Sequence, residues 1–443
     1  MKLWQKKADL DKEIEAFTVG NDPILDLSIA RFDVYGSVAH AEMLAACHLL
    51  THDELKQLRR ELISILSLIE KGEFSIGPGF EDVHSQLEHL LIKKIGVAGK
   101  KIHTGRSRND QVLVAARMFF REEIMNITHT INFLFDTLIE LSAVYQNYGL
   151  PGYTHFQAAM PSSFGLWFAA YAENLVDDLR QWLCTFNIIN QNPLGSAAGY
   201  GSSLPINRQH TTRLLGFKEM DFNVVHAAMG RGRSEWWMAV AIAAIGQTIG
   251  KMAYDLVLYQ NENFGFVRLP DAFTTGSSIM PHKKNPDVFE LIRARANYWQ
   301  SLPAQIQAIT GNLPSGYHRD YQILKEIIFP ELARLKTTLK ILQKGIAELE
   351  VKKNILSKKK YQILFTVDKV NALVREGIPF REAYRLVGKE VEDGTFTAPA
   401  RAEINTHEGT IGNLQNEQIQ RKKDQVMEQF DFSFVEILQT LVN

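Results

Sequence analysis

Apolar residues recur at helical spacing over three long stretches of the chain. Residues 112–148 contain neither Gly nor Pro, and their apolar side chains return every three or four positions. This pattern predicts one continuous helix, on the order of 50 Å long. Residues 166–192, which lie between two prolines, predict a second long helix, and residues 235–261 predict a third.

The third predicted helix is apolar around most of its circumference. Residues 236–250 carry no charge and include many small side chains, which let neighbouring backbones approach closely. A helix of this kind is normally buried on all sides. The stretch is shorter than the roughly 18 residues that a membrane span needs. We therefore expect no membrane partner and expect the long helices to associate with one another.

The fold class predicted from these patterns is all-α. Clear period-two runs are scarce, and strand patterns do not alternate with helices as they do in a parallel sheet. Shorter amphipathic segments predict an N-terminal helical domain over residues 1–109. The long helices predict a central bundle over 110–354, and shorter segments with proline breaks predict a C-terminal helical domain over 355–443.

Charge and cysteine usage exclude several classes of protein. The 443 residues include 49 Lys plus Arg and 50 Asp plus Glu, a formal net charge of −1. No overall field therefore attracts nucleic acid, so a charged ligand must meet a local cluster. Two cysteines are too few for a disulfide framework, and acidic residues occupy the place of a signal peptide's apolar region. We expect a cytoplasmic protein that binds no nucleic acid.

Two segments superficially resemble cofactor motifs. Residues 84–89, HSQLEH, match neither spacing of the zinc-binding helices H-E-x-x-H and H-x-x-E-H. The glycine-rich residues 195–201 lack the Gly-Lys-Ser/Thr ending of a P-loop. We therefore expect neither a metal nor another cofactor.

Residues 274–287, TTGSSIMPHKKNPD, have the composition of a reactive loop. Glycine and proline interrupt any helix there, and hydroxyl, ammonium and carboxamide groups lie between them. Lys and Asn can bind a carboxylate, and a hydroxyl beside an ammonium loses its proton more readily. The alternative is an ordinary polar loop with solvated lysines.

Residues 101–111, KIHTGRSRNDQ, directly precede the first long helix. A helix N-terminus favours an anion, and Arg106 and Arg108 add bidentate donors, so this segment predicts a carboxylate or phosphate site. The alternative is a helix cap, with Asn109 or Asp110 as the N-cap residue.

Two further segments offer polar side chains. In residues 151–157, PGYTHFQ, His155 lies in a tight turn and could act as a general acid or base, or could be a structural histidine. In residues 313–325, Gln322 and Lys325 are three positions apart and would project from one helix face. Ordinary helix surface is the alternative there.

The segment GSSIMPxKxNP at 276–286 resembles the signature of the fumarase/aspartase superfamily, whose members eliminate fumarate from succinyl compounds. Residues 104–111, 151–157 and 313–322 are similar to segments of the argininosuccinate lyase family in particular. The resemblance implies reversible elimination of argininosuccinate to arginine and fumarate, in arginine biosynthesis. It also implies a homotetramer with a core of long helices, in which three chains contribute to each active site.

The resemblance also implies roles for individual residues. Ser277 would take the proton from the succinyl carbon, His155 would assist departure of the guanidino nitrogen, and Lys283 would stabilise the negative charge that develops. An alternative makes His155 the base. The residues implied to bind substrate are Ser28, His84, Arg108, Asn109, Thr154, Asn285, Tyr317, Gln322 and Lys325.

Departures from the family pattern leave two other functions open. His282 is more typical of adenylosuccinate lyase, although residues 106–111 and 317–322 speak against that enzyme. A non-catalytic structural homologue is the second alternative, and the intact reactive loop speaks against it. The opening residues 3–8 and the segment 229–235 also depart from the family pattern, and we assign no residue in 229–235 to the site.

Overall fold

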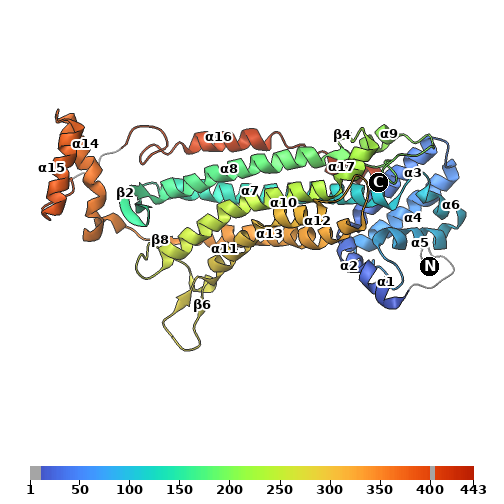
Figure 1. Ribbon diagram of the computed structural model, residues 1–443, viewed down its shortest axis with the longest axis horizontal. Helices are drawn as coiled ribbons and strands as arrows, with labels where there is room; N and C mark the ends of the chain where they lie inside the picture. Colours follow the sequence, from blue (N-terminus) through green and yellow to red (C-terminus); the bar gives the residue numbers. More distant parts are fainter. Residues whose placement is uncertain (1–10, 400–404) are drawn as a thin grey trace.

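Long helices dominate the protein, which we describe from a computed structural model covering residues 11–399 and 405–443. The atypical opening segment 3–8 lies outside these residues. Figure 1 shows an elongated bundle built on α7 (Arg108–Val144), α8 (Phe164–Ile189) and α10 (Val224–Gln260). The three predicted long helices are therefore confirmed. The bundle also contains α11 (Asp287–Trp299), α12 (Leu302–Thr310) and α13 (Ile323–Ala347).

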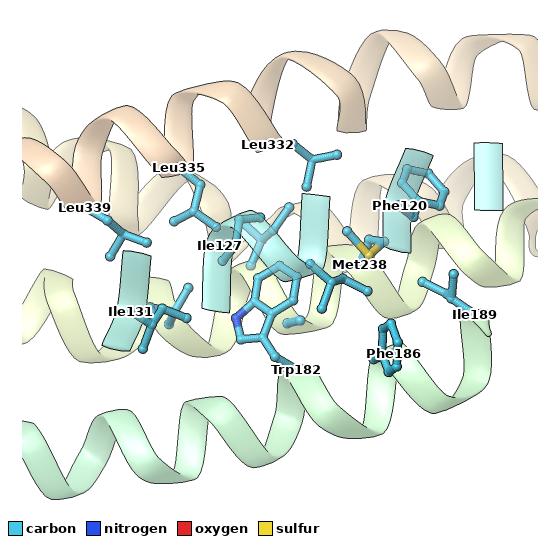
Figure 2. Packing of buried hydrophobic residues seen from close by; sticks show 14 of the residues in the cluster. Phe120, Ile127, Ile131, Trp182, Phe186, Ile189, Met238, Leu332, Leu335 and Leu339 are labelled. Carbon is cyan, nitrogen blue, oxygen red and sulfur yellow. The ribbon is translucent and has the colours of Figure 1, made fainter. Parts of the chain in front are cut away.

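One apolar core runs through the bundle. Figure 2 shows Ile127 and Ile131 of α7 packed near Trp182 of α8, Met238 of α10 and Leu335 of α13. All five side chains are fully buried, because each helix turns its apolar stripe inward. The long helices thus hold their ends in fixed places, and the polar segments at those ends are positioned by the core.

The first long helix, α7, begins at Arg108, about one helical turn before residue 112, where the hydrophobic pattern places its start. Ser107 is the N-cap: its hydroxyl accepts a hydrogen bond from Asn109 N at 3.3 Å. The Asp110 carboxylate accepts one from Ser107 N at 2.8 Å, which completes a capping box. The cap is therefore neither Asn109 nor Asp110, and Asn109 remains available on the first helical turn.

Short helices cover the N-terminal end of the bundle. They are α1 (Lys12–Val19), α2 (Asp22–Leu25), η1 (Asp26–Ile29), α3 (Ala30–Ala46), α4 (His52–Glu70), α5 (Val83–Ile95), α6 (Val97–Lys100) and η2 (Lys101–His103), with α9 (Arg208–Leu214) packed against α3. All of these helices except α9 come from residues 1–109, for which the sequence predicts an N-terminal helical domain.

The segments after residue 354 lie in two places. The helices α14 (Thr366–Arg375) and α15 (Phe380–Glu392) lie at the opposite end of the molecule and share a small apolar cluster. In contrast, α16 (Asn416–Met427) runs along α8, and α17 (Phe434–Val442) packs on α3. Segments of the predicted 355–443 domain therefore lie at both ends of the bundle, because α16 and α17 bury their apolar residues against it.

The strands are short and form two-stranded ladders. The pairs are β1 (Gly149–Thr154) with β2 (Gln157–Ser163), β3 (Gln191–Asn192) with β4 (Glu219–Met220), β5 (Val267–Arg268) with β8 (Glu350–Val351), and β6 (Thr275–Gly276) with β7 (Lys284–Asn285). Further 3₁₀ turns are η3 (Asp271–Phe273), η4 (Arg319–Gln322), η5 (Ile355–Ser357) and η6 (Lys359–Phe365). Within the described residues, no helix is both long and apolar enough to cross a membrane.

Candidate active site

A cleft of about 120 Å³ at the start of α7 gathers most of the predicted substrate-binding residues. We call it the α7 cleft. The predicted residues that line it are His84, Arg108, Asn109, Tyr317, Gln322 and Lys325. They come from three separate parts of the chain, which meet where α5, α7 and the η4–α13 segment begin.

The η4 turn places Gln322 and Lys325 on one side of this cleft. The Gln322 amide donates hydrogen bonds to the backbone oxygens of Thr18 at 3.1 Å and Val19 at 2.7 Å, at the end of α1. Because η4 runs directly into α13, Lys325 follows on the first turn of that helix and points into the protein. The predicted shared face of Gln322 and Lys325 is therefore present.

Lys325 lies between two carboxylates. Its Nζ is 2.6 Å from Asp26 Oδ1 and 2.7 Å from Asp22 Oδ1. Asp26 also accepts a hydrogen bond from Val83 N at 3.3 Å, which ties this cluster to α5. Burial raises the pKa of Asp22, and Asp26 adds to the effect while Lys325 opposes it. One ammonium between two carboxylates leaves this wall of the cleft with an excess of negative charge.

His84 is a buried histidine with a carboxylate partner. Burial disfavours its charged form, but Asp33, whose Oδ2 is 3.0 Å from His84 Nδ1, outweighs burial and raises the pKa of His84. Burial would likewise raise the pKa of Asp33, but His84, Arg106 and a hydrogen bond from Gln111 lower it. The pair therefore favours imidazolium beside carboxylate. The other ring nitrogen, Nε2, has no hydrogen-bond partner among the described residues.

Five charged residues of this cleft and a conformational break were not predicted from the sequence. The five residues are Asp22, Asp26, Asp82, Arg231 and Arg319, whereas the predicted Ser28 is exposed on η1 and is not among the lining residues. The acids at positions 22 and 26 are spaced four apart in DPILD, which is a usable signal for a shared helical face. Nothing in the sequence shows that this face meets Lys325.

The break lies inside α10 at Arg231 and Gly232. Arg231 has φ −67° and ψ 135°, and Gly232 has φ 82° and ψ −39°, so neither residue is helical. A Cβ at position 232 would lie 2.8 Å from the Thr310 methyl group. Both the positive φ and the lack of space for a side chain therefore favour glycine at this position. Glycine within a helical pattern indicates such a break. The direction in which Arg231 then points depends on the packing around it.

His155 and Thr154 lie elsewhere, at the tip of the β1–β2 hairpin. Because Thr154 pairs with Gln157, the turn consists of His155 and Phe156, with φ of 54° and 58°. Two positive φ values match the twist of a hairpin, but side-chain-bearing residues pay about 1–2 kcal/mol each for this conformation. Both side chains are exposed. Strain of this kind is concentrated at functional sites.

Ser277, Lys283 and Asn285 lie on a third part of the chain, the β6–β7 hairpin. The Ser277 hydroxyl oxygen accepts hydrogen bonds from Ile279 N at 3.3 Å and Met280 N at 3.1 Å. Two donors aimed at one oxygen stabilise negative charge on it. The ladder places Asn285 opposite Thr275, and Lys283 is exposed in the connecting loop.

These three groups of residues do not meet within one chain. The α7 cleft lies at the start of α7 and the His155 turn lies beyond its end, and 37 helical residues at about 1.5 Å each separate them by about 55 Å. Figure 1 shows the β6 hairpin projecting from the side of the bundle, away from the helices that form the cleft. Among the described residues, no group of three or more His, Cys, Asp or Glu could hold a metal ion.

Comparisons with known proteins agree on the family. A model of a lyase family matches residues 4–298. Proteins named argininosuccinate lyase from Bacteroides thetaiotaomicron and Parabacteroides distasonis are 53% and 52% identical, over 98% and 97% of this chain and 97% and 96% of their own lengths. A solved structure of an EDDS lyase variant with bound fumarate has a TM-score of 0.74 at 21% identity, covering 99% of this chain and 93% of its own, which confirms the predicted fumarase/aspartase-like fold. The chain therefore belongs to the argininosuccinate lyase family.

Proposed function

We propose that the protein catalyses the reversible elimination of argininosuccinate to arginine and fumarate, as a step of arginine biosynthesis in the cytoplasm. Relatives with this name match it at 52–53% identity over nearly its whole length. The observation that carries the proposal is the α7 cleft, because it brings together six of the residues implied by the family resemblance from segments distant in sequence.

The active enzyme is a homotetramer in which three chains share each active site. The α7 cleft, the His155 turn and the β6–β7 hairpin lie apart in one chain, so their side chains meet only if different chains supply them. The central helices also keep large apolar side chains exposed, including Phe133 at 67%, Leu291 at 65% and Tyr298 at 48%. Exposed apolar surface along long helices indicates association.

Ser277 removes the proton from the succinyl carbon. The hydrogen bonds from Ile279 N and Met280 N to its oxygen favour the charged form of the hydroxyl. Negative charge then develops on the adjacent carboxylate, where Lys283 and Asn285 donate to it. Donors aimed at charge that forms in the transition state lower the barrier rather than tightening ground-state binding.

His155 protonates the guanidino nitrogen as the C–N bond breaks. Its position at the tip of a strained, exposed hairpin lets the imidazole enter a site formed by other chains. Thr154, beside it on the same hairpin, binds the succinyl end of the substrate. The proposed steps use only the side chains of Ser277, Lys283, Asn285 and His155. We therefore propose no cofactor.

The deciding experiment is fumarate release from argininosuccinate by the purified full-length protein, followed by ultraviolet absorbance. Ser277→Ala should abolish turnover while argininosuccinate still binds. Lys283→Met should slow kcat by a factor of about 10² or more, as is typical when one oxyanion donor is lost. Near-normal kcat in the Ser277 variant would refute its role.

Two competing functions give different results in the same assay. Adenylosuccinate lyase, which His282 suggests, would release fumarate from adenylosuccinate and not from argininosuccinate. A non-catalytic homologue would release fumarate from neither substrate. Fumarate from argininosuccinate alone is the outcome that we expect.

A further inference from the structure

Two charged side chains of the α7 cleft, Arg231 and Asp22, have no role in the proposed chemistry. Both line the cleft, and Arg231 is near enough for its charge to act on the Asp22 carboxylate. One is a cation and the other an anion. Together they offer a bound molecule two opposite charges at short range.

Arg231 has a hydrogen-bond donor to spare. Its side chain is 4% exposed, its Nε is 2.9 Å from Glu235 Oε1, and its Nη2 donates to Tyr321 O at 3.2 Å. Neither its Nε, despite the nearby Glu235 carboxylate, nor its terminal Nη1 makes a hydrogen bond among the described residues. Because buried donors are normally satisfied, the unbonded Nη1 of a cleft-lining arginine indicates an acceptor that enters from the cleft. A carboxylate is the group that best matches a guanidinium.

The break in α10 is what directs Arg231 to this place. Gly232 N donates to Glu235 Oε2 at 2.7 Å, while Glu235 Oε1 holds the guanidinium, so one carboxylate fixes both the broken backbone and the side chain. The arginine is therefore held in a single orientation before any ligand binds. Preorganised donors of this kind favour binding because less ordering remains to be done.

Asp22 provides the opposite charge. Lys325 is shared between Asp22 and Asp26, so one positive charge faces two negative ones. The Asp26 side chain is 0% exposed, whereas Asp22 is 14% exposed and can be reached from the cleft. A second cation, arriving with the ligand, would balance the charge at Asp22.

The charges of the cleft decide which part of the substrate Arg231 and Asp22 meet. In argininosuccinate the only ammonium lies on the same carbon as a carboxylate, in the amino-acid group of the arginine half. That carboxylate and that ammonium match the cation and the anion of the cleft. This group takes no part in breaking the C–N bond, which the proposed mechanism assigns to Ser277 and His155.

We propose that Arg231 binds the α-carboxylate and Asp22 binds the α-ammonium of the substrate's amino-acid end. This inference rests on the proposed function, since it takes the unreactive end of argininosuccinate as the ligand. It makes Arg231 and Asp22 specificity residues: they select an amino acid over analogues that lack either charge. Neither residue needs to touch the reacting atoms.

The test measures binding of three probes to the full-length protein by isothermal titration calorimetry. The probes are arginine, agmatine, which lacks the carboxylate, and 5-guanidinopentanoate, which lacks the ammonium. The wild-type protein should bind arginine about tenfold or more tightly than either analogue. No preference for arginine over the analogues would overturn the proposal.

Removal of the cation is tested in the double variant Arg231→Gln/Glu235→Gln, which leaves no buried charge alone. It should lose the preference for arginine over agmatine and keep the preference for arginine over 5-guanidinopentanoate. The exposed Arg233→Gln change, two positions along the same helix, is the matched control and should keep both preferences. An equal loss of affinity for all three probes, as a purely structural role would give, would contradict the assignment of Arg231.

Removal of the anion should give the reverse pattern. Asp22→Asn should lose the preference for arginine over 5-guanidinopentanoate and keep the preference for arginine over agmatine, and Asp22→Glu should restore the lost preference. The exposed Asp53→Asn change on α4 is the surface control. An Asp22→Asn protein that still rejects 5-guanidinopentanoate would overturn the assignment of Asp22.

The same preparations separate this proposal from the proposed function. Fumarate release from argininosuccinate tests the reaction, whereas the calorimetric preferences test the amino-acid site. A wild-type protein that releases no fumarate but shows both preferences would refute the reaction and support the site. A protein that releases fumarate from argininosuccinate but shows neither binding preference would support the reaction and refute the amino-acid site.

Discussion

Mixing two inactive variants should restore activity if different chains supply Ser277 and His155. In one chain these side chains lie on separate hairpins, β6–β7 and β1–β2, which project from different parts of the bundle (Figure 1). In a mixed oligomer, a Ser277→Ala chain still carries His155, and a His155→Asn chain still carries Ser277. A site that takes one residue from each kind of chain is complete.

The size of the effect follows from this arrangement. When equal amounts of the two variants assemble at random, a site has an even chance of an intact Ser277 and an independent even chance of an intact His155. About one quarter of the sites should therefore be complete, and the mixture should regain about 25% of wild-type kcat. Each variant alone has no complete site.

The assay is fumarate release after the two variants are unfolded together in urea and refolded. Separate affinity tags on the two chains verify that mixed oligomers have formed. The control replaces one partner with a chain carrying both Ser277→Ala and His155→Asn, which should restore nothing. Verified mixed oligomers without activity above the parents would show that Ser277 and His155 act from the same chain, and the shared-site reasoning would fail.

Three further changes test individual parts of the structure. Lys325→Met leaves two carboxylates without their shared buried cation, so the free energy of unfolding in urea should fall by about 3–5 kcal/mol; a loss below about 1 kcal/mol would contradict the buried ion cluster. Burial raises the pKa of Asp178 to about 7, above its value in the unfolded chain, so stability should fall as the pH rises from about 4 to about 7. Asp178→Asn removes this fall and should stabilise the protein by about 2–4 kcal/mol near pH 8, whereas the exposed Asp177→Asn should not; identical pH profiles for both variants would refute the cause. Gly232→Ala forces a side chain into a left-handed backbone and against a threonine methyl group, so it should cost about 1–3 kcal/mol of stability and weaken arginine binding through Arg231; an unchanged melting temperature and affinity would contradict this.

The helical bundle was predictable because helix formation and burial leave a local pattern. Apolar residues at three- and four-residue spacing along 112–148 correspond to α7, and the apolar stretch 236–250 forms the middle of α10. In the single chain one side of this stretch is buried, whereas Trp236 and Trp237 are only partly buried and Gln247 is exposed, so burial on all sides is not observed. The residues of the reactive loop were also recognisable, because glycine, proline and a mixture of hydroxyl and ammonium groups differ from ordinary helix surface. Both the helical periodicity and the composition of the loop involve residues that lie close together in the sequence.

The N-cap residue of α7 was harder to predict from the sequence, although helix capping is also a local feature. Ser107, Asn109 and Asp110 are all good capping residues, and the choice among them depends on which oxygen reaches which backbone N–H. In the folded chain Asp110 also accepts hydrogen bonds from Gly195 N at 2.9 Å and Ala197 N at 3.0 Å. Its position is therefore set partly by a loop 85 residues away in sequence.

The α7 cleft depends on packing between segments that are far apart in the chain. Periodicity shows which face of a helix is apolar, but it carries no information about which other helix that face meets. Asp22 meets Lys325 across 303 positions, and Arg231 enters the cleft because α10 breaks at a glycine whose neighbours are set by α12. Local chemistry thus marks the helices and the reactive residues, while the pairing of charges in the binding cleft arises from long-range contacts that no short segment encodes.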